Sequence, residues 1–319
     1  MRRPPVLVLT AGLGTRLRPL TYVRAKAAVP VNGVPLATRA ARWLAAQGFR
    51  DQVFNLHHHP ASIARCLGDG SQLGVRVRYS WEQPVLGSAG GPRHALPLLT
   101  DAGDRRFLIA NGDTLTDVNL DRVLARHAES GAQVTMALIR NPAPDKYGGV
   151  VLDDDGFVRA FTRRGIVSDS YHFIGVQVTE AQVFAGLEDG VPSESVAALY
   201  PRLMQENPRA VAGFVSDASF QDIGMPGDCL ATSLALAREE GDQLISPRAR
   251  VEPTAVLENT AVWDDVEIGA DAHLVECIVA DGARVPEGMA LRRCAVIPAN
   301  AREAAAGERI ERGLLIHPF

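Results

Sequence analysis

Long apolar runs are missing from this chain of 319 residues. A helix that crosses a membrane needs ~20 consecutive apolar residues, and no stretch of the sequence approaches that length. The apolar run Val6–Leu9 follows Arg2 and Arg3, but it is too short for the core of a signal peptide, and glycines interrupt it at once. We therefore expect no membrane partner and a cytoplasmic location.

Cysteine is scarce, and none of the four cysteines forms a Cys-x-x-Cys pair. This spacing argues against a dense disulfide framework and against zinc sites built from paired cysteines. We expect buried thiols in a reducing compartment at Cys66, Cys229, Cys277 and Cys294.

Basic residues are not in excess, because 33 Lys and Arg face 37 Asp and Glu, for a formal net charge of −4. Proteins that bind nucleic acid usually carry a basic surface, so we expect no nucleic-acid partner. The hydrophobic content of 46 % is ordinary for a globular protein, and the length allows a large core and more than one domain.

Strand-like and helix-like segments alternate through the first two-thirds of the chain. Short connections and glycine helix stops such as Gly48, Gly68 and Gly131 separate them. This alternation predicts an α/β fold, with a Rossmann-like mixed, mainly parallel sheet flanked by helices. The expected strands are 6–9, 52–56, 75–79, 107–110, 134–139 and 210–215, with a hairpin of 150–152 and 158–161; the expected helices are 35–47, 61–67, 94–99, 120–130, 195–206 and 228–240.

A different pattern begins after Gly241. Large residues recur about every six positions, with one slip of a residue after Trp263, and small residues follow four positions later. This period is typical of a β-helix, so we expect two domains, 1–241 and 245–319, with Leu314–Ile316 helping to cap the second. The large residues are Ile245, Val251, Leu257, Trp263, Ile268 and Leu274; the small ones are Ala249, Ala255, Ala261 and Ala272.

The first expected strand leads into a glycine turn, Ala11-Gly12-Leu13-Gly14-Thr15. Backbone amides of such a turn can bind an anion, which Arg16, Arg18 and Lys26 would neutralise. The alternative is a plain strand-to-loop turn with surface cations. The Walker A pattern is absent, and the dinucleotide fingerprint fails at Leu17, so neither named phosphate loop applies.

The full string LTAGLGTRLRPLTYVRAKAAVPVNGVPL, which we call the signature segment (residues 9–36), resembles the signature of the sugar-1-phosphate nucleotidyltransferases. Fourteen ordered positions match that pattern, and the family lysine is kept at Lys26. The prolines on either side of the family lysine are replaced by Ala25 and Ala27. The resemblance extends to about Ala237, and family members often carry a left-handed β-helix tail like the one expected here.

The resemblance assigns nucleotide and metal contacts. The string WEQPVLGSAG is similar to the family's base-binding loop, which implies that Gln83, Gly87 and Ser88 read the base through a turn with exposed backbone groups. Asp113 ends an apolar strand, and Asp222 matches a second family aspartate; together they are expected to hold the Mg²⁺ cofactor, which favours one or two carboxylates plus substrate phosphates. For either aspartate taken singly, we would favour a helix cap or a turn.

The sugar side departs further from the family. Gly148 matches a family position beside the sugar, and Arg164 replaces a phosphate-binding lysine. Arg163 stands where the family has a sugar-binding glutamate, so it either favours an anionic sugar or faces solvent. His172 replaces an asparagine, and Asn111 precedes the metal motif. The expected sugar-phosphate contacts are Asn111, Gly148, Arg163, Arg164 and His172.

The triplet His57-His58-His59 invites a metal interpretation. Adjacent histidines project in different directions and no fourth ligand is evident, so we favour a polar loop.

The resemblance implies transfer of a nucleotidyl group from an NTP to a sugar 1-phosphate, with release of pyrophosphate. Ala11, Gly12, Gly14 and Thr15 would bind the triphosphate, while Arg16, Lys26 and Asp113 would carry catalysis. GTP with mannose 1-phosphate is the preferred pair, and glucose 1-phosphate with dTTP or UTP is next. A non-catalytic nucleotide-sugar-binding regulatory subunit and, more weakly, a β-helix acetyltransferase using His273 are the alternatives. We also expect a homo-oligomer.

Overall fold

The computed structural model describes residues 3–166, 169–300 and 302–319. Contacts between Cα atoms divide it into two compact units. The first holds the described residues up to Gly12, together with Arg39–Pro60 and Leu67–Gln221. The second holds Leu13–Thr38, Ala61–Cys66 and Asp222–Phe319, so most of the signature segment groups with the C-terminal part of the chain.

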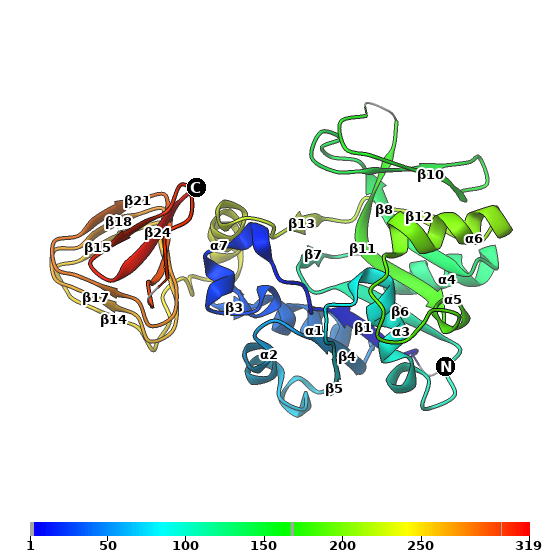
Figure 1. The fold of residues 1–319 in the computed structure, drawn as a ribbon, viewed down its shortest axis with the longest axis horizontal. Coiled ribbons are helices and arrows are strands. Elements are labelled where there is room, and N and C mark those ends of the chain that lie inside the picture. The colour runs from blue at the N-terminus through cyan, green and yellow to red at the C-terminus, as the bar shows by residue number, and fades with distance from the viewer. Residues whose placement is uncertain (1–2, 167–168, 301) are drawn as a thin grey trace. The chain divides into compact units, whose positions relative to one another are not determined.

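The first unit is built on a nine-stranded sheet in the order β10-β9-β11-β6-β1-β4-β5, with β8 also pairing with β11 and β12 pairing with β8 (Figure 1). The central strand β1 is parallel to both β4 and β6. The strands are β1 (Val6–Leu9), β4 (Asp51–Leu56), β5 (Arg76–Trp81), β6 (Arg106–Asn111), β8 (Val134–Arg140), β9 (Gly149–Leu152), β10 (Val158–Thr162), β11 (Tyr171–Glu180) and β12 (Val211–Val215).

Helices connect these strands, as the alternation predicts. They are α1 (Leu36–Ala46), α2 (Pro60–Leu67), α3 (Gly87–Leu99), α4 (Leu120–Ser130), α5 (Gln182–Ala185) and α6 (Tyr200–Glu206), the last preceded by a π-helical turn at Ser195–Leu199. The mainly parallel α/β class is therefore confirmed. A short pair, β7 (Thr114–Thr116) and β13 (Phe220–Asp222), forms a separate two-stranded sheet.

The structure differs from the expectation at one missed strand and at one helix start. The ten-residue strand β11 runs antiparallel to both β6 and β8, although no strand was predicted there. Its interior Gly175, which has a φ of 78°, interrupts the apolar pattern that would otherwise announce a strand. Helix α3 begins at Gly87 and not at His94, so the predicted Gly-Ser-Ala-Gly turn is the first turn of a helix.

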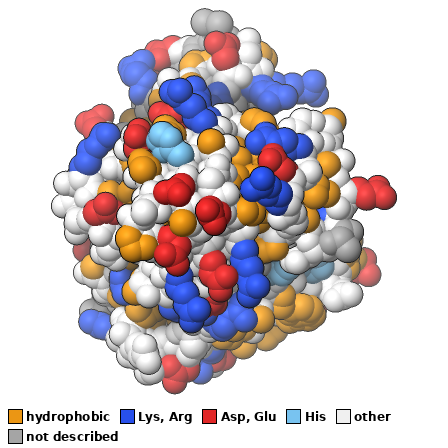
Figure 2. Space-filling model, turned by 90° about the vertical axis from the view of Figure 1, so that its left-hand side faces the viewer, with side chains coloured by type: hydrophobic (Ala, Val, Ile, Leu, Met, Phe, Trp, Pro, Cys, Tyr) orange, Lys and Arg blue, Asp and Glu red, His pale blue; other side chains and the backbone are white. Residues whose placement is uncertain are grey.

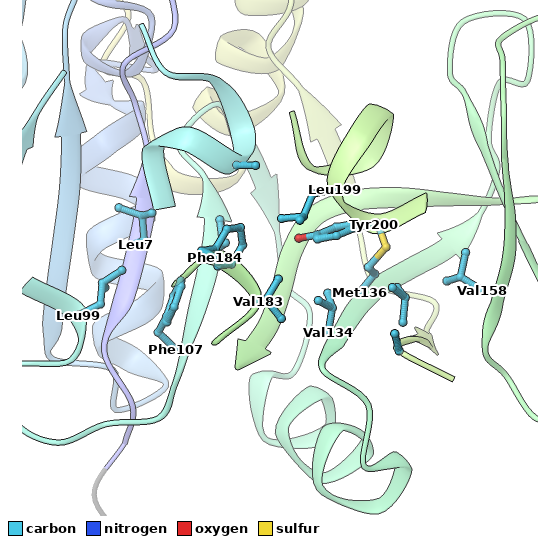
Figure 3. Packing of buried hydrophobic residues seen from close by; sticks show 14 of the residues in the cluster. Leu7, Leu99, Phe107, Val134, Met136, Val158, Val183, Phe184, Leu199 and Tyr200 are labelled. Atoms are coloured by element: carbon cyan, nitrogen blue, oxygen red, sulfur yellow. The ribbon is translucent and has the colours of Figure 1, made fainter. Parts of the chain in front are cut away.

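Apolar side chains from strands and helices form the core of the first unit, which Figure 3 shows in part. Phe107 of β6 and Phe184 of α5 place their ring centroids 5.8 Å apart. Both rings, Leu7 and Tyr200 are fully buried. This packing fixes the central strands, and with them the loops that follow their carboxyl ends.

The second unit begins with three short 3₁₀ helices, of which the first holds Arg16 and the third holds Lys26. These are η1 (Thr15–Leu17), η2 (Leu20–Tyr22) and η3 (Lys26–Ala28), followed by the hairpin β2 (Pro30–Val31) and β3 (Val34–Pro35). Helix α7 (Pro226–Glu240) leads into a parallel β-helix with three faces, whose short strands are β14 (Arg250–Val251), β15 (Val256–Glu258), β16 (Ala261–Val262), β17 (Glu267–Ile268), β18 (His273–Val275), β19 (Ile278–Val279), β20 (Arg284–Val285), β21 (Ala290–Arg292) and β22 (Cys294–Pro298).

Equivalent residues of neighbouring coils lie 17 positions apart, as the pairs Val251–Ile268 and Leu257–Leu274 indicate. The one-residue slip noted in the sequence therefore recurs in every coil. The prediction of Trp263 as an inward residue is wrong, because Val262 pairs with Val279 and belongs to the β-helix core. Counting six residues strictly therefore gives Trp263, which is one position after the core residue Val262.

The last strands extend one face of the β-helix. Strand β24 (Leu314–Pro318) pairs antiparallel with β22 and with β23 (Arg309–Glu311). Leu314, Leu315 and Ile316 are buried there. Cys277 and Cys294, on neighbouring coils, are free thiols whose sulfur atoms lie 3.6 Å apart.

Charges of both signs alternate on the β-helix surface. Glu267 lies in register between Arg250 and Arg284, and its Oε2 is 3.5 Å from Arg284 Nε. Figure 2 shows the same mixture of acidic and basic side chains on the face it draws. Such interspersed charges largely cancel at a distance.

Within the part of the chain that the structure describes, no helix is both long enough and apolar enough to cross a membrane.

The corrected register of the β-helix predicts which side chains stabilise it. Leu274→Ala removes a fully buried side chain from this core and should lower the free energy of unfolding by about 2–5 kcal/mol. Ile310→Ala, at a position that is 44 % exposed in β23, is the control and should change it by less than about 0.5 kcal/mol. Urea unfolding of both variants measures these changes. Equal losses of unfolding free energy would contradict the assignment of Leu274 to the β-helix core.

Candidate functional site

A buried hydrogen-bond network joins the carboxyl ends of three parallel strands in the first unit. Beyond β1, the backbone N–H of Thr10 donates to Asn55 Oδ1 at 2.5 Å, and that of Ala11 donates to the same oxygen at 3.3 Å. Asn55 Nδ2, on β4, donates to Glu82 Oε1 at 2.7 Å. The other carboxylate oxygen of Glu82 accepts from the N–H of Leu86 at 2.9 Å.

Glu82 is only 1 % exposed, so its carboxylate depends on these donors. Gly91 of α3 packs directly on it, since a Cβ at Gly91 would lie 2.7 Å from Glu82 Oε1. Thr10, Asn55 and Glu82 were not predicted as site residues. The available signal was Asn55, a polar residue inside the apolar string QVFNL, and Glu82, which lies next to Gln83.

The start of α3 is occupied by protein contacts. The backbone amides of Ala89 and Gly90 both donate to the carbonyl of Ser193, and Ser88 Oγ donates to Glu194 Oε2 at 2.6 Å. The expectation of exposed amides at this turn is therefore wrong, because the segment around Ser193 already accepts from them. Gln83 is exposed, and Gly87 and Ser88 are partly exposed; all three remain predicted base contacts.

Asp113 follows β6 through a close turn. The N–H of Gly112 donates to the carbonyl of Leu9 at 3.0 Å, and a Cβ at Gly112 would lie 2.6 Å from Thr10 Cγ2. Asn111, the last residue of β6, lies against Gly175, where a Cβ would come within 2.5 Å of Asn111 Nδ2. Both glycines are required by packing, and they bring β6 close to its neighbours just before Asp113.

An aromatic cluster surrounds His172 of β11. Its ring centroid lies 4.3 Å from that of Tyr147 and 4.7 Å from that of Phe220. Burial lowers the pKa of His172, and a hydrogen bond to the backbone of Gly148 offsets this only in part. Within residues 3–166, 169–300 and 302–319, no group forms a hydrogen bond with the buried Nδ1 atom. The structure thus brings Gly148 and His172 together, as the sugar-contact prediction requires.

Arg163 and Arg164 lie just after β10, and both are exposed. His57 Nδ1 is 2.9 Å from the carbonyl oxygen of Glu82, and the rings of His58 and His59 meet edge to face at 4.3 Å.

In the second unit, Gly14 brings the stem of Lys26 close to the glycine turn. Gly14 has a φ of 61°, and a Cβ there would lie 2.8 Å from Thr21 Cγ2 and 3.0 Å from Lys26 Cβ. Thr21 Oγ1 donates to the carbonyl of Gly14 at 3.0 Å. Only glycine permits both this backbone conformation and this close approach.

Arg16 and Asp222 also meet in the second unit. Arg16 Nη2 lies 3.9 Å from Asp222 Oδ2, with the Arg16 side chain 64 % exposed and that of Asp222 14 % exposed. A Cβ at Gly224 would lie 3.0 Å from Arg16 Nη1 and 3.2 Å from Asp222 Oδ2. The guanidinium of Arg16 is therefore mostly exposed and lies beside a carboxylate.

The predicted site residues divide between the two units. Asn111, Asp113, Gly148 and His172 belong to the first, and Gly14, Arg16, Lys26 and Asp222 belong to the second. Among the described residues, no group of three or more His, Cys, Asp or Glu is arranged as a metal cluster. The joint binding of Mg²⁺ by Asp113 and Asp222 remains a prediction.

Comparison with known proteins gives a family, curated relatives and solved structures. The model of the nucleotidyl transferase family matches residues 5–239. The mannose-1-phosphate guanylyltransferase of Mycobacterium tuberculosis is 31 % identical over 303 residues, which cover 90 % of this chain and 82 % of that protein. The N-acetylmuramate alpha-1-phosphate uridylyltransferase of Neisseria meningitidis is 34 % identical over 222 residues, covering 68 % of this chain and 92 % of that protein.

Among solved structures, HddC from Yersinia pseudotuberculosis complexed with GMP-PN superposes with a TM-score of 0.63 at 19 % identity, covering 73 % of this chain and 99 % of that one. This similarity concerns the fold alone.

The buried His172 predicts a pH dependence of stability. Its pKa is lowered in the folded state, so below about pH 6.5, the usual histidine value, the unfolded chain binds more protons and the folded state loses stability. His172→Phe preserves a flat ring between Tyr147 and Phe220 and should lose less stability between pH 7 and pH 5. Denaturant unfolding of the native chain and of His172→Phe at several pH values tests this. The same change of unfolding free energy with pH in both proteins would contradict it.

Proposed function

We propose GTP and mannose 1-phosphate as the substrates of this chain, which belongs to the nucleotidyl transferase family and is a sugar-1-phosphate nucleotidyltransferase. The family resemblance found in the sequence is thereby confirmed. The observation that supports the substrate pair is the similarity to the M. tuberculosis guanylyltransferase, which spans both the catalytic region and the β-helix.

The proposed reaction needs no protein nucleophile. An oxygen of the sugar 1-phosphate forms a bond to the α-phosphorus of the nucleotide as the bond to the β-phosphate oxygen breaks, and pyrophosphate leaves with that electron pair. Transfers of this type depend mainly on positioning and on neutralising negative charge.

The cations of the signature segment have the chemistry for these tasks. Arg16, with its mostly exposed guanidinium, binds the leaving pyrophosphate and can follow its movement. Lys26, whose stem packs against Gly14, binds the sugar phosphate as a point charge. The backbone of Gly12–Thr15 borders the triphosphate in this proposal.

The carboxylates Asp113 and Asp222 fit Mg²⁺, which takes hard oxygen ligands and keeps positions for water and substrate phosphates. Asp222 is largely buried beside Arg16, and Asp113 follows a glycine turn that packing requires. When bound, Mg²⁺ would supply positive charge to the nucleotide phosphates.

The aromatic cluster is the proposed sugar subsite. The buried Nδ1 of His172 has no hydrogen-bond partner among the described residues, and a sugar hydroxyl is the partner that we propose. Because burial keeps the ring neutral near pH 7, one ring nitrogen accepts while the other donates. Arg164 remains the proposed second contact to the sugar phosphate. Arg163 is the residue that we propose to influence which sugar 1-phosphate is preferred.

Three further expectations also remain proposals: a catalytic domain at 1–241, a β-helix tail with its cap at 245–319, and assembly into a homo-oligomer. The name of the N. meningitidis uridylyltransferase supports UTP as the second candidate nucleotide, and glucose 1-phosphate stays the second candidate sugar phosphate.

A substrate panel tests the proposed function. Release of pyrophosphate is measured with GTP, UTP and dTTP against mannose and glucose 1-phosphates, with Mg²⁺ or with a chelator. We expect the highest kcat/KM for GTP with mannose 1-phosphate, and loss of turnover in the chelator. Preference for UTP or dTTP would contradict the substrate pair, and no turnover with any pair would favour the regulatory alternative.

The contact between Arg16 and Asp222 predicts that a substitution at Gly224 lowers kcat, although Gly224 touches no substrate in our proposal. Gly224→Ala should push the flexible Arg16 side chain aside, because its Cβ would lie 3.0 Å from Arg16 Nη1. We expect kcat to fall by about tenfold to a hundredfold, with stability changed by less than about 0.5 kcal/mol. Gly186→Ala, where a Cβ meets nothing within 4 Å, is the matched control. A native kcat in Gly224→Ala would show that the position of the Arg16 side chain beside Asp222 does not affect turnover.

A further inference from the structure

Arg24 ties the signature segment to the β-helix within the second unit. Its Nε donates to Asp281 Oδ2 at 2.6 Å, and its Nη2 donates to Asp264 Oδ2 at 2.6 Å and to Asp281 Oδ1 at 2.7 Å. Its guanidinium also lies over the ring of Trp263, with Cζ 5.5 Å from the centroid. One side chain therefore meets two carboxylates and one aromatic face, all from the β-helix.

These contacts are well sheltered from solvent. The Arg24 side chain is 13 % exposed, those of Asp264 and Asp281 are 33 % and 25 % exposed, and Trp263 is 4 % exposed. Burial acts to lower the pKa of Arg24, but the two carboxylates outweigh it, so the guanidinium stays charged. Charge-assisted, bidentate bonds of this kind fix direction as well as distance.

The carboxylates themselves are held by the β-helix. Ser246 Oγ donates to Asp264 Oδ1 at 2.6 Å, and the N–H of Asp264 donates to Asp281 Oδ1 at 3.2 Å. Asp264 and Asp281 occupy equivalent places on adjacent coils, 17 residues apart. The anchor for Arg24 is thus a rigid feature of the solenoid.

Arg24 lies two residues before Lys26, at the point where this chain departs from its family. Ala25 and Ala27 stand where the family has prolines. The N–H of Ala25 donates to Ser62 Oγ at 3.0 Å, a bond that proline cannot make. The N–H of Ala28 then donates to the carbonyl of Ala25 at 2.8 Å, and that of Val29 donates to the carbonyl of Lys26 at 3.1 Å.

We infer that Arg24 is a positioning residue: by bonding Asp264 and Asp281 of the β-helix, it fixes the backbone that presents Lys26, in place of the rigid prolines. The β-helix thereby contributes to catalysis without touching substrate. This inference rests on the proposed function for its kinetic consequence, but its structural consequence does not depend on any substrate.

The test removes the tether without leaving a buried charge unpaired. In the triple variant Arg24→Met, Asp264→Asn and Asp281→Asn, all three substituted side chains become neutral, and such replacements often leave stability unchanged. We expect a melting temperature close to native, faster hydrogen exchange at the Ala28 and Val29 amides, and a kcat lowered by about tenfold to a hundredfold. For Arg24→Lys, kcat and the exchange rates should lie between those of the native chain and the triple variant, because a lysine ammonium cannot form the bidentate hydrogen bonds of a guanidinium.

Arg248→Ala is the matched control. Arg248 also approaches Asp264, at 3.9 Å, and pairs with Asp265, but it belongs to the β-helix and its side chain is 61 % exposed. We expect native exchange at Ala28 and Val29 and native kcat in this variant.

The outcomes are separable. Native kcat and native exchange in a folded triple variant would overturn the inference. If the triple variant does not fold, kcat and hydrogen exchange are measured in Arg24→Lys instead. Native kcat and native exchange in that variant would also overturn the inference. If the native chain turns over no substrate pair, the proposed function fails, while hydrogen exchange still tests the tether by itself.

Discussion

The first unit depends on one buried carboxylate. Glu82 is almost inaccessible to solvent, and its two oxygens accept from Asn55 and from the N–H of Leu86. Removing either donor would leave one buried carboxylate oxygen without that hydrogen bond, which costs about 1–3 kcal/mol. The network therefore holds the segment beyond β1, the strand β4 and the start of α3 in one arrangement. These are the segments from which the sequence predicts the nucleotide contacts Ala11, Gln83 and Gly87.

The second unit meets a different constraint in our proposal, where it must hold cations ready for phosphates without neutralising them. Arg24 is fully engaged by two aspartates, whereas Arg16 lies 3.9 Å from Asp222 and has a mostly exposed side chain. The two arginines of one short segment thus have different roles. In our proposal one fixes the backbone, and the other stays mobile enough to follow departing pyrophosphate.

The sequence predicted the α/β class, most strands and helices, and the family, because alternating apolar segments and the ordered signature are local features. It missed β11, where Gly175 interrupts the pattern, and it misplaced the inward residue Val262, because each coil has 17 residues and not 18. The Arg24–Asp264 and Asn55–Glu82 contacts join positions distant in the chain, so no local pattern could reveal them. The early start of α3 depends in the same way on acceptors at Ser193 and Glu194.

The central claim is that the chain positions two substrates for direct attack and provides no nucleophile of its own. The stereochemical course at the α-phosphorus tests this most directly, using a nucleotide with a chiral phosphorothioate at that position and the sugar 1-phosphate that the chain prefers. A single in-line displacement predicts inversion of configuration in the nucleotide sugar. Retention would mean two displacements through a nucleotidyl-enzyme, and it would contradict the account.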